Sequence, residues 1–589
     1  MIINMKMNYN IFLIFFLYFN VIQNTFSQVK SEKENISIQQ VTIIKSYSPS
    51  LSNIFKIPET VKFLDSLFMK KKKIEYSVLP IPILSTFKPS KGEPQILNPE
   101  KVLLKYNSFF RAGFGNFNHM LIDYTSEIKL GRIQSINWLI KYDGLLKKIP
   151  NTVLSNSNSN SIFNISHSYH SNSLSSLSQI NFHQLQQSFY GIRSNFLDPL
   201  IFEFIDPRQN LNYLSVGTRW NWFNSFTRSL DFKIFLTSDS YQSNEFEIDL
   251  KSKFQFSFIG FMVSLSPSFN HFSNEFASDY YSGSPSSLSS GKVGLGLNVS
   301  SSQKKIKFKI GAKSVYGLSD GFNEKQLYFF PYIDVLYNSS KRNFSPFINI
   351  KGDLILNNFR KFTHENQFTA PGIKIQSNEV PVEIRLGSKS LIAKGWEFII
   401  NGYYQINKNH PFYGNFGFDS TNLNFTSYRY GNSFEIIYDE IKIIGFETSI
   451  KANFKNSGFV NLNASYNELK TNNIDKPWNL PKLKLNFSGH IKIKSRLYAQ
   501  WQLNYLGRRV NAYRAEFLLQ DPINASILSE ELKPFIYSNF KITYEINDKW
   551  NFFVDGENVF NQNYLEWSNY NSYGSQYLIG FQYNFDFNL

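Results

Sequence analysis

The last stretch of the chain, from Tyr577 to Leu589, alternates between apolar and polar residues. Such a period of two predicts a strand with one apolar and one polar face, and its length suffices to cross a membrane at a tilt. A spanning strand must satisfy its backbone hydrogen bonds within the protein, which requires a closed barrel. We therefore predict an all-β, transmembrane, antiparallel up-and-down β-barrel. Leu578, on the polar face, is the single exception.

Short and long connections alternate between the predicted strands. Asn547–Lys549 and Lys494–Arg496 are tight turns, whereas the intervening connections are long. Outer-membrane barrels show this alternation, with short periplasmic turns and long external loops. Continued back to residue 107, the pattern predicts about 22 strands, with both termini in the periplasm. The long connections near the C-terminus are predicted at Asn407–Tyr430, Asn467–Lys482 and Gly507–Phe535.

Tryptophans gather at one end of the predicted strands. Trp138, Trp396 and Trp550 follow predicted periplasmic turns, and Trp220 and Trp222 precede one. Aromatic residues concentrate at membrane–water interfaces, where their rings meet the lipid head groups. The positions therefore predict an aromatic girdle at the periplasmic rim.

The N-terminus has the features of an exported protein. Residues 1–27 combine Lys6, an apolar run over Ile11–Ile22 and the small-x-small pattern Thr25–Ser27, which together predict a secretory signal peptide. No other apolar run is long enough for a membrane helix. An exported, strand-rich chain of this kind is expected in a bacterial outer membrane.

Residues 28–106 differ in character from the predicted barrel, residues 107–589. Proline is frequent, alternation is weak and four lysines stand together at Lys70–Lys73. This composition favours an extended periplasmic segment with little core of its own.

Charge and cysteine content exclude several functions. The chain contains no cysteine, which excludes thiolate metal sites, thiol catalysis and disulfides. Its formal net charge is +16, but lysine and arginine are spread over strand faces and turns instead of forming a stripe. We therefore expect an anionic membrane surface or an anionic solute as partner, and no nucleic acid.

Three segments of the C-terminal third resemble the barrel of TonB-dependent receptors. Ile444–Glu447 is similar to the family's Gly-x-Glu strand, and Leu480–Leu483 with Tyr505–Arg509 resembles its Pro-led hairpin. Glu557–Tyr564 resembles its Asn-Leu-Phe-Asp-x-x-Tyr segment. The resemblance implies an outer-membrane receptor that takes up a solute, with TonB as a possible partner.

A further resemblance concerns the N-terminal segment. Ile38–Ile44 resembles the TonB box, with Val41, Thr42, Ile43 and Ile44 as its core; the alternative is an ordinary strand packed under the barrel. The family places a plug domain between box and barrel, and residues 28–106 are too short for a full plug. The resemblance therefore supports barrel and location more directly than energised import.

Motifs for catalysis are sparse, and we predict neither an enzyme nor a cofactor or metal. Gly317–Gly321 matches the Gly-x-Ser-x-Gly pattern of a nucleophile elbow, but it joins two predicted strands, whereas the elbow needs a strand followed by a helix. His167 and His170 lie on opposite faces of a predicted strand and cannot share a metal. A barrel phospholipase with a Ser/His pair at the outer rim stays an alternative.

The predicted lumen face carries basic residues on two strands. They are Lys305, Lys307 and Lys309 on one strand and Lys482 and Lys484 on another. One interpretation is an electropositive path for anions, and the other is that any large lumen is simply polar. Glu245, Glu247 and Asp249 argue against a uniformly positive pore.

Two functions of different classes follow, together with one hypothesis about the lumen. The first is a receptor or transporter that captures a solute with its long loops, and the second is an accessory barrel that holds another protein; a passive diffusion channel is a third. A barrel this wide needs an obstruction. We expect residues 28–106, with infolded loops, to fill part of the lumen, with Lys70–Lys73 meeting Glu245, Glu247 and Asp249; the alternative is that a partner protein fills it.

The apolar face of the last strand also predicts an assembly signal. Its aromatic residues resemble the terminal signal that the barrel assembly machinery recognises before insertion among outer-membrane lipid and lipopolysaccharide. The residues are Tyr577, Phe581, Tyr583, Phe585 and Phe587.

Overall fold

The computed structural model describes residues 106–149, 152–192, 202–302, 305–318, 327–339, 344–418, 426–514 and 526–587. The strands of its first half are β1 (Ser108–Gly115), β2 (His119–Leu130), β3 (Gln134–Leu145), β4 (Asn158–His170), β5 (Leu174–Ser188), β6 (Arg208–Trp222), β7 (Thr227–Asp239), β8 (Asn244–Phe258), β9 (Phe261–Phe276), β10 (Ser286–Ser302), β11 (Ile306–Gly317), β12 (Leu327–Tyr337) and β13 (Phe344–Ile355).

The strands of the second half are β14 (Asn378–Ala393), β15 (Trp396–Asn415), β16 (Phe434–Asn453), β17 (Gly458–Thr471), β18 (Leu483–Lys494), β19 (Leu497–Leu506), β20 (Arg509–Arg514), β21 (Ile527–Leu532), β22 (Phe535–Glu545), β23 (Trp550–Glu557), β24 (Leu565–Trp567), β25 (Tyr570–Asn571) and β26 (Gln576–Phe585). The short helices are η2 (Asn116–Asn118), α2 (Phe359–Glu365), η5 (Ser427–Arg429) and η6 (Lys455–Ser457).

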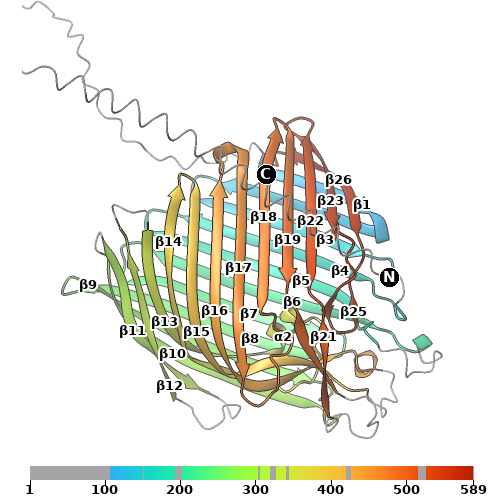
Figure 1. Cartoon of the computed structure of the whole chain (residues 1–589). Coiled ribbons are helices and arrows are strands. Elements are labelled where there is room, and N and C mark those ends of the chain that lie inside the picture. The colour runs from blue at the N-terminus through green and yellow to red at the C-terminus, as the bar shows by residue number, and fades with distance from the viewer. Residues whose placement is uncertain are drawn as a thin grey trace, which may run out of the picture. The chain divides into compact units, whose positions relative to one another are not determined.

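The strands form one closed antiparallel ring (Figure 1). The main sheet has 24 strands, but β20 and β21 form a side hairpin while β19 pairs directly with β22, so the wall has 24 − 2 = 22 strands. β1 closes the ring against β26, with Phe110 opposite Tyr583 and Phe114 opposite Ile579. This confirms the predicted class and strand number.

Two strands are longer than the sequence pattern indicates. β15 and β16 have 20 residues each, about twice what a membrane crossing needs. The predicted connection from Asn407 is wrong, because β15 continues to Asn415 through a register shift between Asn407 and His410. Such a bulge interrupts the alternation and hides the rest of the strand from a sequence pattern. Past the bulge, β15 pairs in parallel with β20, so the predicted loop Gly507–Phe535 contains a hairpin.

The outer face of the barrel is apolar and the inner face is largely polar. Ile444 and Ile579 are each 64% exposed on the outside, as expected of side chains that meet lipid. Leu578 points the other way and is buried with Leu121 and Phe553. Leu578, the single exception in the terminal alternation, therefore points inward and makes an apolar contact. The contact reaches β2 on one side and β23 on the other side of the β1–β26 pair that closes the barrel.

Aromatic rings of the last strand form a continuous band with neighbouring strands. The Tyr583 ring lies 4.6 Å from that of Trp550, and the Phe581 ring lies 6.2 Å from that of Phe110. Phe587 contacts Trp138 with a ring separation of 5.8 Å. Trp550 and Trp396 begin β23 and β15 directly after short turns. The predicted aromatic girdle is thus present at the rim with the short turns.

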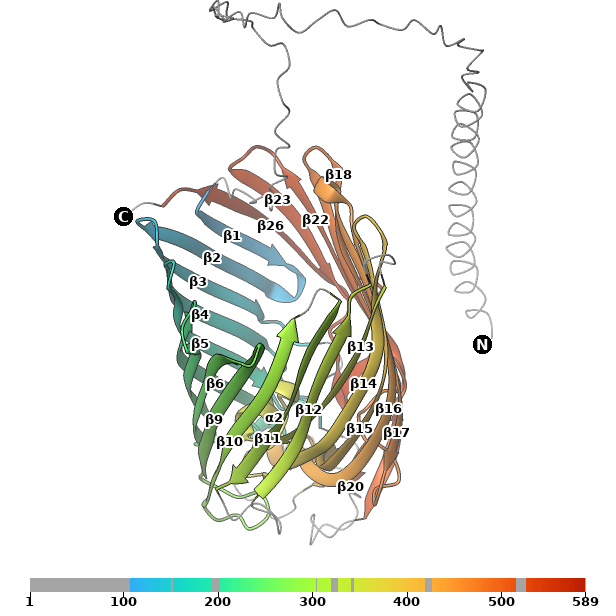
Figure 2. The same cartoon turned by 90° about the vertical axis from the view of Figure 1, so that its left-hand side faces the viewer.

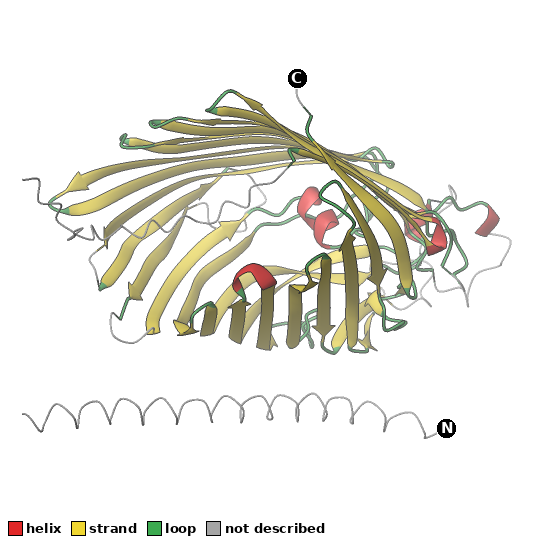
Figure 3. Cartoon of the chain, turned by 90° about the horizontal axis from the view of Figure 1, so that it is seen from above, coloured by secondary structure: helices red, strands yellow, loops and turns green. Residues whose placement is uncertain are grey.

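The long connections lie at the opposite rim, and α2 lies inside the ring (Figures 2 and 3). It belongs to the connection between β13 and β14. Among the described residues, no helix has both the length and the apolar character needed to span a membrane.

Candidate functional site

The start of helix α2 is determined by the residue that precedes it, Asn358. Asn358 precedes the helix in an extended conformation, and its side-chain oxygen accepts a hydrogen bond from the Lys361 backbone at 3.0 Å. This is the usual role of asparagine at a helix N-terminus. At the other end, the backbone of Asn366 donates to the Phe362 carbonyl. The sequence therefore places a seven-residue helix, about two turns long, in the connection between two strands.

Acidic residues of β8 hold α2 against the wall. The Glu245 carboxylate accepts hydrogen bonds from the Phe359 and Arg360 backbones, at 2.7 and 3.3 Å. Negative charge is favourable there because the first N–H groups of a helix lack partners within it. Glu247 accepts from Asn358 at 2.7 Å and from the Arg360 guanidinium at 2.5 Å. Both carboxylates are buried, so α2 is anchored by hydrogen bonds shielded from water.

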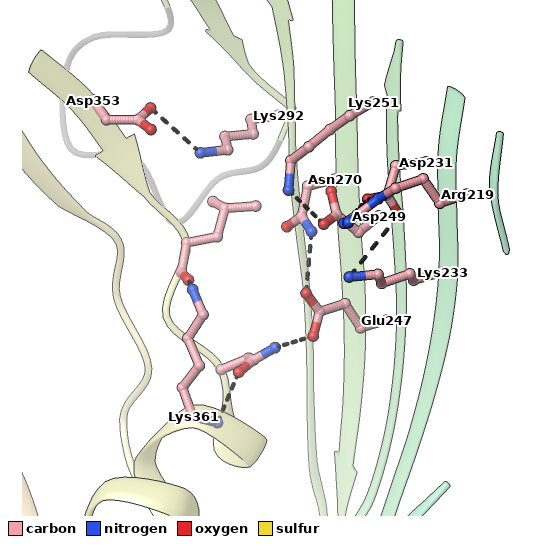
Figure 4. Close-up of polar contacts among 12 residues, drawn as sticks. Arg219, Asp231, Lys233, Glu247, Asp249, Lys251, Asn270, Lys292, Asp353 and Lys361 are labelled. Carbon is pink, nitrogen blue, oxygen red and sulfur yellow. Dashed lines mark hydrogen bonds and ion pairs between the residues drawn. The ribbon is translucent and has the colours of Figure 1, made fainter. Parts of the chain in front are cut away.

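The acidic lumen residues have partners within the described part of the chain. Glu245 and Glu247 accept hydrogen bonds from residues 358–360, and Asp249 pairs with Lys251 at 2.6 Å (Figure 4). Lys70–Lys73 lie outside the described residues, so their contact with these acids stays a prediction. The sequence indicates acidic residues on a lumen face, but it does not indicate that residues 358–360 bind them.

Aromatic side chains of several loops pack into one cluster, which we call the loop cap. Its centre comprises buried residues from the connections β5–β6, β9–β10, β13–β14, β15–β16 and β23–β26 and from the adjoining strand ends. Its members are Phe189, Leu211, Tyr213, Phe272, Phe276, Tyr280, Leu356, Phe359, Phe362, Phe368, Ala370, Ile373, Ile375, Tyr413, Phe416, Tyr428, Phe434, Ile436 and Tyr570.

The loop cap connects opposite sides of the ring. Tyr280, after β9, stacks on Phe416, after β15, with ring centres 3.5 Å apart. Phe368, in the α2 loop, stacks on Tyr570, in the connection that precedes β26, also at 3.5 Å. Both pairs are nearly parallel, with interplanar angles of 9° and 14°, so their rings are in direct face-to-face contact. The loops at this mouth therefore form a packed apolar lid instead of separate flexible hairpins.

His364 completes the contact of α2 with the wall. Its ring stacks on Tyr213 at 4.2 Å, and the Tyr213 hydroxyl donates to Thr363. Burial, helped by the nearby Arg360 guanidinium and by His183, lowers the pKa of His364 well below its ordinary value. The imidazole is therefore neutral at pH 7, which suits stacking on a phenol ring.

A cavity of about 1050 Å³ lies between the loop cap and one side of the wall. On the wall side, polar residues stand in register across neighbouring strands: Ser449 pairs with Asn463, Asn463 with Asn486, Asn486 with Asn504 and Asn504 with Tyr537. Asn486 also donates a hydrogen bond to Asn504. We call Ser449, Asn463, Asn486 and Asn504 the amide ladder.

The cap side of this cavity is aromatic. Tyr190, Phe368, Tyr570 and Tyr573 line it together with Glu566 of β24. Burial raises the pKa of Glu566, although the nearby Arg509 opposes this shift. The cavity thus has an amide-rich wall on one side and a ring-rich roof on the other.

A second cavity of similar volume lies near the short turns and is basic. Lys307, Lys309, Arg385 and Lys389 line it, with Asp334 as the acid. Arg385 is compensated by Glu383 at 3.2 Å and by an ion pair with Glu447, and it also donates to Asn401. The remaining lysines, Lys307, Lys309 and Lys389, outnumber the single acid Asp334 and make this cavity locally basic.

The structure separates the predicted lumen lysines. Lys307 and Lys309 line the basic cavity, and Lys484 lines the cavity under the loop cap. Lys305 is exposed in the turn before β11. Lys482 lies at the rim with the long connections and pairs with Glu468 at 2.6 Å, because it precedes β18 instead of belonging to it. The basic residues do not form one continuous path.

The remaining predicted features are the TonB-box-like segment, the Gly-x-Ser-x-Gly segment and the possible metal ligands. Val41, Thr42, Ile43 and Ile44 lie outside the described residues. Gly317 ends β11, and the next described strand, β12, begins at Leu327, so strands flank the Gly-x-Ser-x-Gly segment on both sides. Within the described part of the chain, no group of three or more His, Cys, Asp or Glu side chains is arranged to hold a metal ion.

Sequence reasoning missed the amide ladder and the loop cap. The sequence indicates that the asparagines of the ladder lie on polar strand faces. It does not indicate that they stand next to one another, because that depends on the register between the strands. The aromatic residues of the loops were visible too, although nothing in the sequence indicates that loops so far apart pack together.

Comparisons with known proteins identify the fold. No protein-family model matches the chain, and no curated protein matches it. Among solved structures, it is similar to the FrpB iron transporter from Neisseria meningitidis, with a TM-score of 0.60 and 11% identity over 82% of this chain and 81% of that one. It is also similar to the siderophore receptor PirA from Acinetobacter baumannii (TM-score 0.58, 12% identity, 81% and 80% covered) and to the copper transporter OprC (TM-score 0.55, 8% identity, 81% and 80% covered). The chain therefore has the fold of outer-membrane receptors and transporters.

Proposed function

We propose that this protein is an outer-membrane receptor of the TonB-dependent type that captures a solute and passes it into the periplasm. The observation that carries the proposal is the loop cap above a cavity of about 1050 Å³ inside a 22-strand wall. A passive channel needs a continuous open path, whereas this mouth is covered by packed aromatic rings. A covered cavity suits capture followed by controlled release.

The arrangement also supports an orientation. The long connections and loop cap would face the exterior, and the short turns would face the periplasm together with both termini, as in other outer-membrane barrels. In this orientation Val41–Ile44 would be available to TonB. The aromatic band of β26 would face lipid and serve the barrel assembly machinery. No bond is made or broken in this function, so we assign no enzymatic activity.

The experiment compares solute depletion from the medium. Cells lacking the protein, cells complemented with the intact chain and cells complemented with a chain lacking residues 38–44 are grown in the same medium, and the remaining solutes are measured by mass spectrometry. We expect one class of solute to persist when the protein is absent and to be consumed again only with the intact chain.

Two other outcomes would contradict the proposal. Identical depletion in all strains, combined with loss of another outer-membrane protein from the deletion strain, would identify an accessory barrel. A large steady conductance of the intact protein in planar bilayers would identify a passive channel.

A further inference from the structure

We propose that the cavity under the loop cap binds a neutral, polyhydroxylated solute of the oligosaccharide class. This inference rests on the proposed function and names the substrate class of that site. It follows from the charge, the hydrogen-bonding groups and the ring surface of the cavity, taken in turn.

The charge balance disfavours an anionic ligand. Four charged residues line the cavity, of which Glu447, Glu557 and Glu566 are acidic and Lys484 alone is basic. An anionic solute would meet more carboxylate than ammonium groups there. The acids are also partly occupied, since Glu447 pairs with Arg385 and Glu557 accepts from the Tyr537 hydroxyl. A strongly cationic ligand therefore gains little as well, which leaves a neutral one.

The wall is built for a ligand that both donates and accepts hydrogen bonds. Sites for apolar ligands are lined mainly by hydrophobic side chains with few polar groups. Here the wall carries the amide ladder, and an amide offers two N–H donors and a carbonyl acceptor. Neighbouring strands are about 4.8 Å apart, so the ladder repeats polar groups at that spacing across the strands. An extended ligand with repeating hydroxyls can match such a row.

Three buried amides along the cavity have polar atoms without partners among the described residues. They are the Asn156 nitrogen Nδ2, the Gln187 oxygen Oε1 and the Gln576 oxygen Oε1. These residues are only 2%, 1% and 7% exposed. Buried polar atoms ordinarily have a hydrogen-bond partner. These atoms have almost no accessible surface, so a ligand hydroxyl, which both donates and accepts, would reach them through a local shift of the lining side chains.

The roof supplies ring surface. Tyr190, Tyr570 and Tyr573 come from two separate connections and line the cavity, with Tyr570 and Tyr573 only 3% and 8% exposed and Tyr190 more open. Aromatic rings with a hydroxyl combine an apolar face with a polar tip. A sugar ring has the same mixed character, with C–H groups on its faces and hydroxyls on its edge. The ladder would therefore hold a sugar chain by the hydroxyls on its edge, and the partly exposed ring of Tyr190 would contact its faces.

The test is calorimetric titration of the full-length protein in detergent with defined probes. The neutral probes are linear hexasaccharides of glucose, of xylose and of N-acetylglucosamine, and the charged ones are ferric citrate and spermidine. We expect at least one neutral hexasaccharide to bind and the charged probes not to bind. The pair of substitutions Asn486→Leu and Asn504→Leu should weaken binding at least about tenfold, because it removes paired donors and acceptors of the wall.

Two controls test whether a loss of binding is specific to the cavity under the loop cap and whether each variant is folded. Lys307→Leu changes the basic cavity and should leave hexasaccharide affinity unchanged. A heat-modifiable band on gels verifies that each variant is folded, and Asn486→Ala alone replaces the leucine pair if that pair does not assemble.

Two results would overturn the inference. One is the absence of binding by all three hexasaccharides, and the other is binding of a charged probe that the ladder substitutions abolish. In the second case the depletion experiment would still show uptake, so the receptor function would stand while the substrate class would be wrong. If the wild-type protein showed neither hexasaccharide binding nor solute uptake, both the substrate class and the receptor function would be contradicted.

Discussion

The Arg360 guanidinium on α2 lies 2.5 Å from the Glu247 carboxylate on β8, and this pair ties a long loop to the inner wall of the barrel. The two side chains are only 17% and 6% exposed, and the Arg360 guanidinium also lies over the Phe235 ring at 4.0 Å. Glu245 adds hydrogen bonds from the same wall to the start of the helix. The loop that carries α2 is therefore fixed at its centre and not merely at its ends.

Removing this anchor should release the loop. Because Arg360→Ala leaves Glu247 buried without its cation, we expect the docked loop to lose about 3 kcal/mol. Proteases added to intact cells should then cut within residues 356–377 much faster than in the wild type. The matched control is Arg508→Ala, since Arg508 pairs with Glu531 while both side chains are more than half exposed. Equal cleavage of Arg360→Ala and wild type would show that the anchor is dispensable.

Acid should loosen the same loop through His364. Its pKa is lowered in the folded state, so the undocked loop binds a proton more readily than the docked one. Docking is therefore unaffected above about pH 6.5, the ordinary pKa of histidine, and weakens as the pH falls below it. Part of the ring is exposed, which makes the effect modest. Hydrogen exchange of residues 356–377, expressed as protection relative to the intrinsic exchange rate at each pH, should show lower protection at pH 5 than at pH 7.

The control for this pH effect is His364→Phe, which can still stack on Tyr213 but does not titrate. Its loss of protection between pH 7 and pH 5 should be smaller than that of the wild type. An equal change in protection in the wild type and in His364→Phe would contradict the assignment to His364.

A charge on the lipid face of the last strand should prevent assembly. Phe581 packs on Phe110 and Trp550 in the outer aromatic band, so Phe581→Asp places a carboxylate among lipid and rings. The cost is about 2–4 kcal/mol near the midplane, and we expect the same direction for Phe585→Asp. The heat-modifiable band should be lost in outer-membrane fractions. Gln582→Glu, on the inner face of the same strand, is the control, and normal levels of all three variants would contradict the prediction.

Conductance can test whether residues 28–105 obstruct the lumen in addition to the loop cap. Tyr106 and Asn107 are kept, since Asn107 hydrogen-bonds Asp586 and Phe587 at the barrel seam. We compare the intact chain, a chain lacking residues 28–105, a chain with a short glycine-serine linker in place of residues 356–377, and the combination. If residues 28–105 and the loop of residues 356–377 each block the lumen, a large steady conductance is expected only when both changes are combined. Full conductance from the loop replacement alone would show that residues 28–105 leave the lumen open.

The sequence by itself determined the class of the fold, because the features that define it are local. Alternation over Tyr577–Leu589 follows from the two faces of one strand, and the tight turn at Asn547–Lys549 follows from neighbouring residues. The strand count and the girdle position of Trp550 come from repeating such local patterns. Each of these can be derived without knowing which strands are neighbours.

Only the tertiary structure decided what lies inside the barrel, because those contacts join residues far apart in the chain. Asn463, Asn486 and Asn504 become one row through the register of three strands. Phe368 meets Tyr570 across some two hundred residues of sequence, so the loop cap has no local signature. Pairings of this kind depend on the closure of the whole ring, which brings distant loops to a single mouth.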